Sequence, residues 1–181
     1  MARFNRFVDD HDSDGWDEVL CVTLGLPVRS VEARADGCRQ FVVAAEQLLN
    51  AAQANPVDSR TNTLTGNPIC CLVRHAVELA LKVACPKAAS PIKGHDLEGR
   101  LVEVLALGRR LGLPDPLGFE HLVSDFHEVD PGGSLFRYAH EGDRACCVNP
   151  IVLRADLVTI LTALDDYLVP VGENWDRAVT S

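Results

Sequence analysis

Side chains that bind phosphate or transfer protons gather in the stretch SLFRYAHEGDRACC, residues 134–147. Arg137, Tyr138 and His140 lie within four positions of one another. An arginine can hold a phosphate with two parallel hydrogen bonds, and histidine is the most frequent general acid or base near neutral pH. The stretch therefore predicts either a catalytic or phosphate-binding site, or a polar seam where a helical bundle closes.

A second group of polar side chains interrupts the apolar segment ICCLVRHAVELALKVAC, residues 69–85. Arg74, Glu78 and Lys82 recur at intervals of four and share one helical stripe, and His75 adjoins it. If they are surface ion pairs, each pair would stabilise the helix by a few tenths of a kcal/mol. A helix this apolar has little face left for solvent, so the stripe can equally face a cleft or a partner. Both interpretations stay open.

Glu78 connects the two groups, because it is the only acid on its stripe. We expect Arg137 to pair with it through two parallel hydrogen bonds. The neighbours of Arg137, including Leu135 and Tyr138, would wedge the segment against the bundle. His140 is expected to be peripheral.

Two other patterns are typical of metal sites but are incomplete. Residues 10–15, DHDSDG, match the opening of a calcium-binding loop and Glu18 fits its ninth position, but the twelfth position holds Cys21 instead of an acid. Cys70-Cys71 and Cys146-Cys147 are adjacent pairs, whereas zinc ligands are usually two to four residues apart. We expect no metal and no cofactor.

His95-Asp96 precedes another apolar periodic segment. Asp96 is a favourable N-cap for a helix that starts there, and a ligand-binding role for His95 is the alternative.

Apolar residues with helical spacing predict an all-α bundle of about five helices. Ser30 is the expected N-cap of the first helix, and Asn-Pro pairs are expected to open the second and the last. The polar residues 57–66 are expected to form a loop, and residues 20–28 are a possible strand. An irregular acidic arm, 1–29, would precede the bundle, 30–181. The predicted helices cover residues 31–54, 67–85, 95–113, 119–129 and 150–170. The second is apolar nearly all round and is expected at the centre of the bundle. Pro114 and Pro116 are expected to end the third, and DPGG, residues 130–133, to end the fourth.

The composition limits the classes of function. The net charge is −9, with six acids between residues 9 and 18. Such a chain lacks the broad basic face that supplies most non-specific affinity for nucleic acid, although a local basic pocket stays possible. An odd number of cysteines, seven, and no apolar leader favour a reduced, cytoplasmic protein. No apolar run is long enough to cross a membrane.

The strings RHAVELALK, GHDLEGRL and LFRYAHE resemble, in their order and separation, the motifs of the HEPN superfamily (higher eukaryote and prokaryote nucleotide-binding). The resemblance covers residues from about 36 to 168. It implies a helical bundle, commonly a homodimer, of the kind found in toxin–antitoxin, phage-defence and CRISPR systems. Active members cleave RNA without metal through an Arg and a His separated by four to six residues near the start of the last core helix.

Arg137 stands where that arginine would be expected, but two residues separate it from His140. This spacing favours a module that binds a nucleotide, an RNA or a protein partner without the usual catalytic motif. The alternative is a dimeric, metal-independent endoribonuclease that uses Arg137 and His140. For the binding module, the candidate ligand-binding or polar-cleft residues are Arg74, His75, Glu78, Lys82, His95 and Tyr138.

Overall fold

A computed structural model describes residues 30–54, 59–85, 95–136, 149–175 and 179, without the side chains of residues 59–65. These residues form helices and no β-strand, so the predicted all-α class is confirmed. The predicted acidic arm, 1–29, with its possible strand at 20–28, lies outside the described residues.

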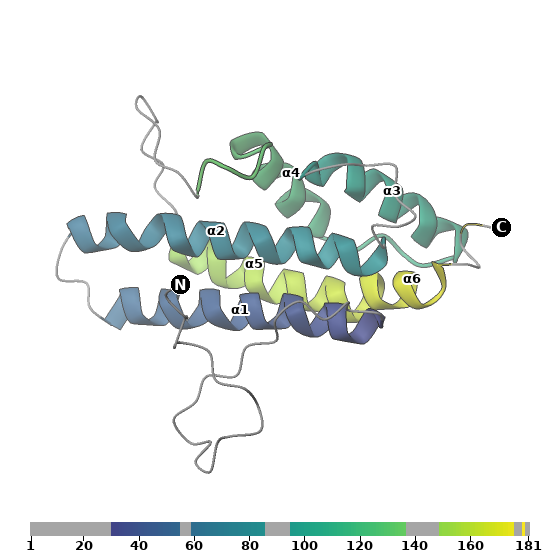
Figure 1. Ribbon diagram of the computed structural model, residues 1–181, viewed down its shortest axis with the longest axis horizontal. Coiled ribbons are helices and arrows are strands. Elements are labelled where there is room, and N and C mark those ends of the chain that lie inside the picture. The colour runs from purple at the N-terminus through teal and green to yellow at the C-terminus, as the bar shows by residue number, and fades with distance from the viewer. Residues whose placement is uncertain (1–29, 55–58, 86–94, 137–148, 176–178, 180–181) are drawn as a thin grey trace, which may run out of the picture.

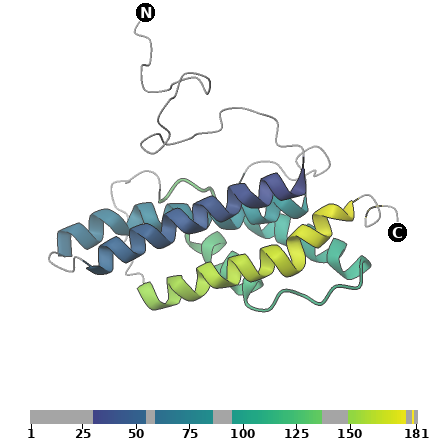
Figure 2. The ribbon, with the colours of Figure 1, turned by 90° about the horizontal axis from the view of Figure 1, so that it is seen from below.

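Helices α1 (Val31–Ala54) and α2 (Ser59–Ala84) lie side by side along the long axis of the molecule (Figures 1 and 2). They run antiparallel because few residues separate them. The predicted N-cap of α1 is confirmed, since the backbone N–H of Ala33 donates to Ser30 Oγ at 3.1 Å. The buried residues of α1 recur every three or four positions and face α2 and α5; they are Ala35, Cys38, Val42, Ala45 and Leu49.

The predicted start of the second helix at Asn67-Pro68 is wrong, and so is the predicted loop over residues 59–66, the part of it that the structure describes. Helix α2 begins at Ser59 and passes through Pro68 without ending. Pro68 is exposed, so water can satisfy the backbone group that loses its intrahelical partner there. The additional turns make α2 about as long as α1, so the two helices accompany each other along their length (Figure 1).

Helices α3 (Leu97–Arg110) and α4 (Phe119–Val129) form a pair on the other side of α2 from α1 (Figure 1). Asp96 is the N-cap of α3, as predicted, and accepts a hydrogen bond from the N–H of Gly99 at 3.0 Å. Helix α3 ends before the prolines that were expected to break it, because the chain turns at Gly112 with φ +76°. Helix α4 ends where the sequence DPGG predicts.

The last helix begins as predicted at Asn149-Pro150, where Asn149 Oδ1 accepts a hydrogen bond from the backbone N–H of Ile151 at 2.9 Å. Its predicted end at Pro170 is wrong. Helix α5 (Pro150–Ala163) continues through a π-helical turn, Leu164–Leu168, into α6 (Val169–Glu173).

Proline in an ordinary helix would clash with the carbonyl four residues earlier. Here the wider π turn, Leu164–Leu168, precedes Pro170 and makes room for its ring. Helix α5, the π turn and α6 thus form one rod beside α1 (Figure 2), and the prediction of about five helices is confirmed.

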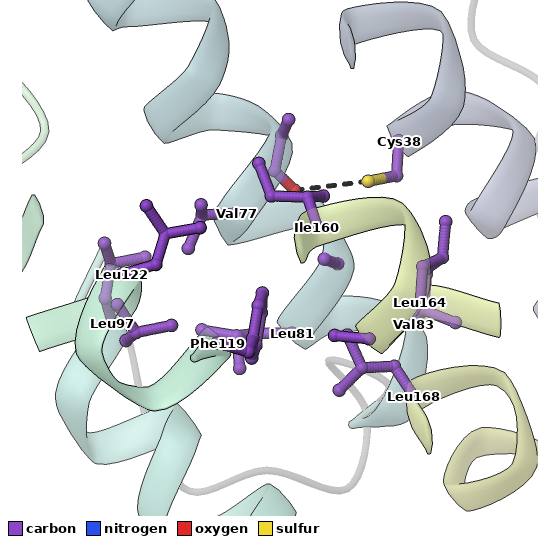
Figure 3. Close-up of a cluster of buried hydrophobic side chains, with 14 of the residues drawn as sticks. Cys38, Val77, Leu81, Val83, Leu97, Phe119, Leu122, Ile160, Leu164 and Leu168 are labelled. Atoms are coloured by element: carbon purple, nitrogen blue, oxygen red, sulfur yellow. Dashed lines mark hydrogen bonds between the residues drawn. The ribbon is translucent and has the colours of Figure 1, made fainter. Parts of the chain in front are cut away.

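The core forms around α2, which contacts α1, α3, α5 and α6. This agrees with its prediction as the central helix. Figure 3 shows Val77 and Leu81 of α2 in a cluster with apolar side chains from other helices, among them Phe119 of α4 and Ile160 of α5. In the described part of the chain, no helix is both long and apolar enough to cross a lipid bilayer.

Candidate functional site

The polar stripe of α2 forms the centre of a buried network. Glu78 is 0% exposed, and its two carboxylate oxygens have different partners. Lys82 Nζ donates to Oε1, while Oε2 lies 2.8 Å from His95 Nδ1 and 3.3 Å from Arg74 Nη1. The structure therefore brings together four of the residues predicted as a polar cleft, from two motifs far apart in the sequence.

Burial alone would raise the pKa of the Glu78 carboxyl, because a charge is poorly solvated inside a protein. Hydrogen bonds and charges from Lys82 and His95 outweigh this effect and lower the pKa from its ordinary value of 4.5 to about 2. Glu78 is thus ionised at neutral pH and can only accept hydrogen bonds.

Arg74 extends the network to the end of α4, where it meets Asp130. Its side chain is 3% exposed, and Nε donates to the carbonyl of Asp130 at 3.0 Å and lies 3.3 Å from Asp130 Oδ2. Nη2 donates to the carbonyl of His95 at 3.2 Å. The guanidinium thus joins three segments of the chain.

Asp130 is held in turn by the DPGG turn that follows α4. Its Oδ1 accepts hydrogen bonds from the N–H groups of Ser134 and Leu135 at 2.9 and 3.1 Å. Gly133 has φ +70°, and a Cβ there would lie 2.8 Å from Arg74 Nη1. Glycine is therefore required both for the turn and for the close approach of the guanidinium.

His75 adjoins the stripe in sequence but packs against α1. Its ring contacts Phe41 of α1 edge to face, with ring centroids 4.5 Å apart. One residue corresponds to about 100° around a helix, so His75 faces α1 while its neighbour Arg74 faces the end of α4.

Arg137, Tyr138 and His140 lie outside the described residues, so the expected pairing of Arg137 with Glu78 stays a prediction. The segment that leads to them is described as far as Phe136. The ring of Phe136 packs edge to face on Phe126 of α4, with centroids 6.2 Å apart. The start of the third motif, LFRYAHE, thus lies beside the DPGG turn, whose Asp130 contacts Arg74.

The candidate metal ligands give no centre in the described part of the chain, where no group of three or more His, Cys, Asp or Glu side chains could hold an ion. Residues 10–21 and Cys146-Cys147 lie outside it. Cys70 and Cys71 form no disulfide bond, and Cys70 is buried.

Asp130 is the member of the network that sequence reasoning missed. The sequence DPGG by itself predicts only the end of a helix. An acid at the end of a helix, followed by a glycine turn, can accept the N–H groups of that turn, and this was the available signal.

The network balances two cations, Arg74 and Lys82, against two carboxylates, Glu78 and Asp130. Only its edge reaches the surface: the side chains of Lys82 and His95 are 20% and 43% exposed, against 0% for Glu78. This edge can bind a small polar group, while the interior fixes its geometry. Comparison with protein-family models, with curated proteins and with solved structures gave no match.

Proposed function

We propose that this chain is a HEPN-like helical module of an RNA-related defence, toxin–antitoxin or regulatory system, and that it binds RNA or a nucleotide without cleaving it. The observation that supports this function is the contact between the first two motifs, where His95 Nδ1 lies 2.8 Å from Glu78 Oε2. It gives an acidic chain a small surface edge with a cation and an imidazole.

The competing interpretation of the same network is structural. Buried polar groups that satisfy one another can fix how helices pack without binding any ligand. Exposure of His95 and Lys82 at one edge favours the binding function, because an entirely structural network has no need to reach the surface.

The first experiment measures binding and cleavage together. Full-length protein is mixed at low salt with a labelled single-stranded RNA, binding is followed by fluorescence anisotropy, and the RNA is then run on a denaturing gel. We expect saturable binding and intact RNA. Lys82→Met should weaken binding by about three- to tenfold through loss of a phosphate partner. Arg109→Ala, at an exposed arginine paired with Asp115, is the control and should leave the affinity unchanged.

Other outcomes would overturn the proposal. RNA cleavage that disappears in both Arg137→Ala and His140→Ala, with both variants folded, would establish the endoribonuclease instead. Failure to bind either RNA or nucleotides at low salt would refute ligand binding and leave a protein partner as the remaining function of the module.

A homodimer, which the resemblance implies, and a cytoplasmic location, which the cysteine content favours, are part of this proposal. Exposed apolar side chains on α5 support it: Ile151 is 74% exposed, Val152 53% and Val158 64%. Size-exclusion chromatography with light scattering should give twice the monomer mass, and Val158→Asp should shift it to the monomer. A monomer for the parent protein at micromolar concentration would exclude the dimer.

A further inference from the structure

The two ring nitrogens of His95 have different environments. Nδ1 lies 2.8 Å from Glu78 Oε2, and the ionised carboxylate can only accept a hydrogen bond. Nδ1 must therefore carry a proton. In a neutral imidazole this leaves Nε2 unprotonated, with a lone pair that accepts a hydrogen bond.

Nε2 is the ring nitrogen of His95 that no described residue engages. The His95 side chain is 43% exposed, and among the described residues its polar contact is made through Nδ1. The carboxylate next to it offers no free site for a ligand, because Glu78 is fully buried and both of its oxygens are engaged. His95 thus presents a hydrogen-bond acceptor where the underlying network presents none.

The position of this acceptor is fixed by the backbone as well as by the ring. The carbonyl of His95 accepts from Arg74 Nη2 at 3.2 Å. The next residue, Asp96, caps α3 by accepting from the N–H of Gly99 at 3.0 Å. A group held at both its ring and its main chain loses little freedom when it binds a ligand.

Lys82 supplies a positive charge beside the acceptor. Its ammonium and the His95 ring each pair with one oxygen of the same carboxylate, so they are neighbours at this edge. An ammonium has three donors, and its side chain is 20% exposed. The complementary ligand group is a hydroxyl, which donates to Nε2, next to an anion, which pairs with Lys82.

RNA carries such a pair at every nucleotide, because its ribose 2′-hydroxyl adjoins the 3′-phosphate, and DNA lacks the hydroxyl. We propose that His95 distinguishes RNA from DNA by accepting a hydrogen bond from the 2′-hydroxyl, with Glu78 as the residue that positions its ring. The inference rests on the proposed binding of RNA and specifies how the same site recognises it.

The first test examines the ring itself in the full-length protein. Nitrogen-15 NMR distinguishes the two tautomers of a neutral histidine. At mildly alkaline pH we expect His95 to carry its proton on Nδ1. Glu78→Gln should shift His95 toward the other tautomer, while exposed His121 stays unchanged. Protonated Nε2 in the parent protein would overturn the proposal, since Nε2 would then be a donor.

The second test measures the preference for RNA. Affinities for an RNA and for a DNA of the same sequence, with uracil in both, are compared in the parent protein, His95→Ala and His121→Ala. One hydrogen bond to a buried or ordered partner corresponds to a preference of up to about tenfold. We expect this preference in the parent and in His121→Ala, and near equality in His95→Ala.

The outcomes separate the two proposals. Binding of RNA and DNA with equal affinity by the parent protein, or an unchanged preference in His95→Ala, refutes the role of His95 and leaves RNA binding standing. Absence of RNA binding refutes the proposed function itself. His95→Ala is expected to fold, because His95 is half-exposed and Glu78 keeps Arg74 and Lys82 as partners.

Discussion

Replacing Arg74 with alanine tests whether the buried network holds the fold together. Arg74 joins α2 to the end of α4 and to the start of α3, through Asp130 and the carbonyl of His95. In Arg74→Ala, Asp130 loses its cation and Glu78 loses one of three partners. Both carboxylates stay buried, and water cannot readily replace the guanidinium.

The expected cost follows from this burial. Removing one partner of a buried ion pair typically costs about 3–5 kcal/mol, because the other charge is left unpaired. A small domain has a total stability of about 5–15 kcal/mol. We therefore expect Arg74→Ala to fold, with a much lower midpoint in urea.

Arg39→Ala is the matched control, because Arg39 also has carboxylate partners but lies at the surface. It is 2.7 Å from Glu32 and Asp165 and 2.8 Å from Asp36, with a side chain 32% exposed. Exposed pairs contribute about 0.2–1 kcal/mol each at most and are screened by salt. We expect a loss of about 1 kcal/mol.

The assay is urea denaturation followed by far-ultraviolet circular dichroism, at about 0.1 M and about 1 M salt. The cost of Arg74→Ala should change little between the two, whereas most of the cost of Arg39→Ala should disappear at high salt. If Arg74→Ala loses no more free energy of unfolding than Arg39→Ala does, with the same dependence on salt, the buried ion pairs of Arg74 do not stabilise the fold as proposed.

Three further predictions concern single residues. Glu78 has a folded-state pKa of about 2, below its ordinary 4.5, so the stability that its ionised carboxylate contributes is complete above about pH 4.5 and is lost as the pH falls toward 2. Glu78→Gln should therefore lower the free energy of unfolding more at about pH 6 than at about pH 3, which urea midpoints at the two pH values will show. A Cβ at Gly108 would lie 1.9 Å from Tyr167 Oη, so Gly108→Ala should lower the melting temperature, whereas Gly37→Ala, with nothing within 4 Å, should raise it. Burial raises the pKa of the Cys38 thiol to about 12, so iodoacetamide at about pH 8 should alkylate Cys38 only on unfolding. Peptide mapping distinguishes Cys38 from the other cysteines, and its rapid alkylation in the folded protein would contradict this.

Helix starts with a side-chain cap were predictable from sequence because their causes are local. Ser30, Asp96 and Asn149 each accept a hydrogen bond from a backbone N–H two or three residues ahead. The interaction needs no other part of the chain, so the residue types and their order are sufficient.

Proline positions were not predictive in the same way, because tertiary packing decides whether a helix continues past one. Pro68 and Pro170 both lie within helical rods where an end or a start was expected. In the first case α1 offers a neighbour along the additional turns of α2. In the second, a π turn makes room for the proline, and the sequence carries no local sign of that turn.

The candidate site shows the same division. Spacing by four residues placed Arg74, Glu78 and Lys82 on one stripe, since helical geometry alone fixes which residues share a face. Whether the stripe met solvent or protein depended on where α3 and the end of α4 would pack. The contacts of Glu78 with His95 and of Arg74 with Asp130 span 17 and 56 residues, and such pairings arise only when helices far apart in the sequence are brought together by burial of their apolar faces.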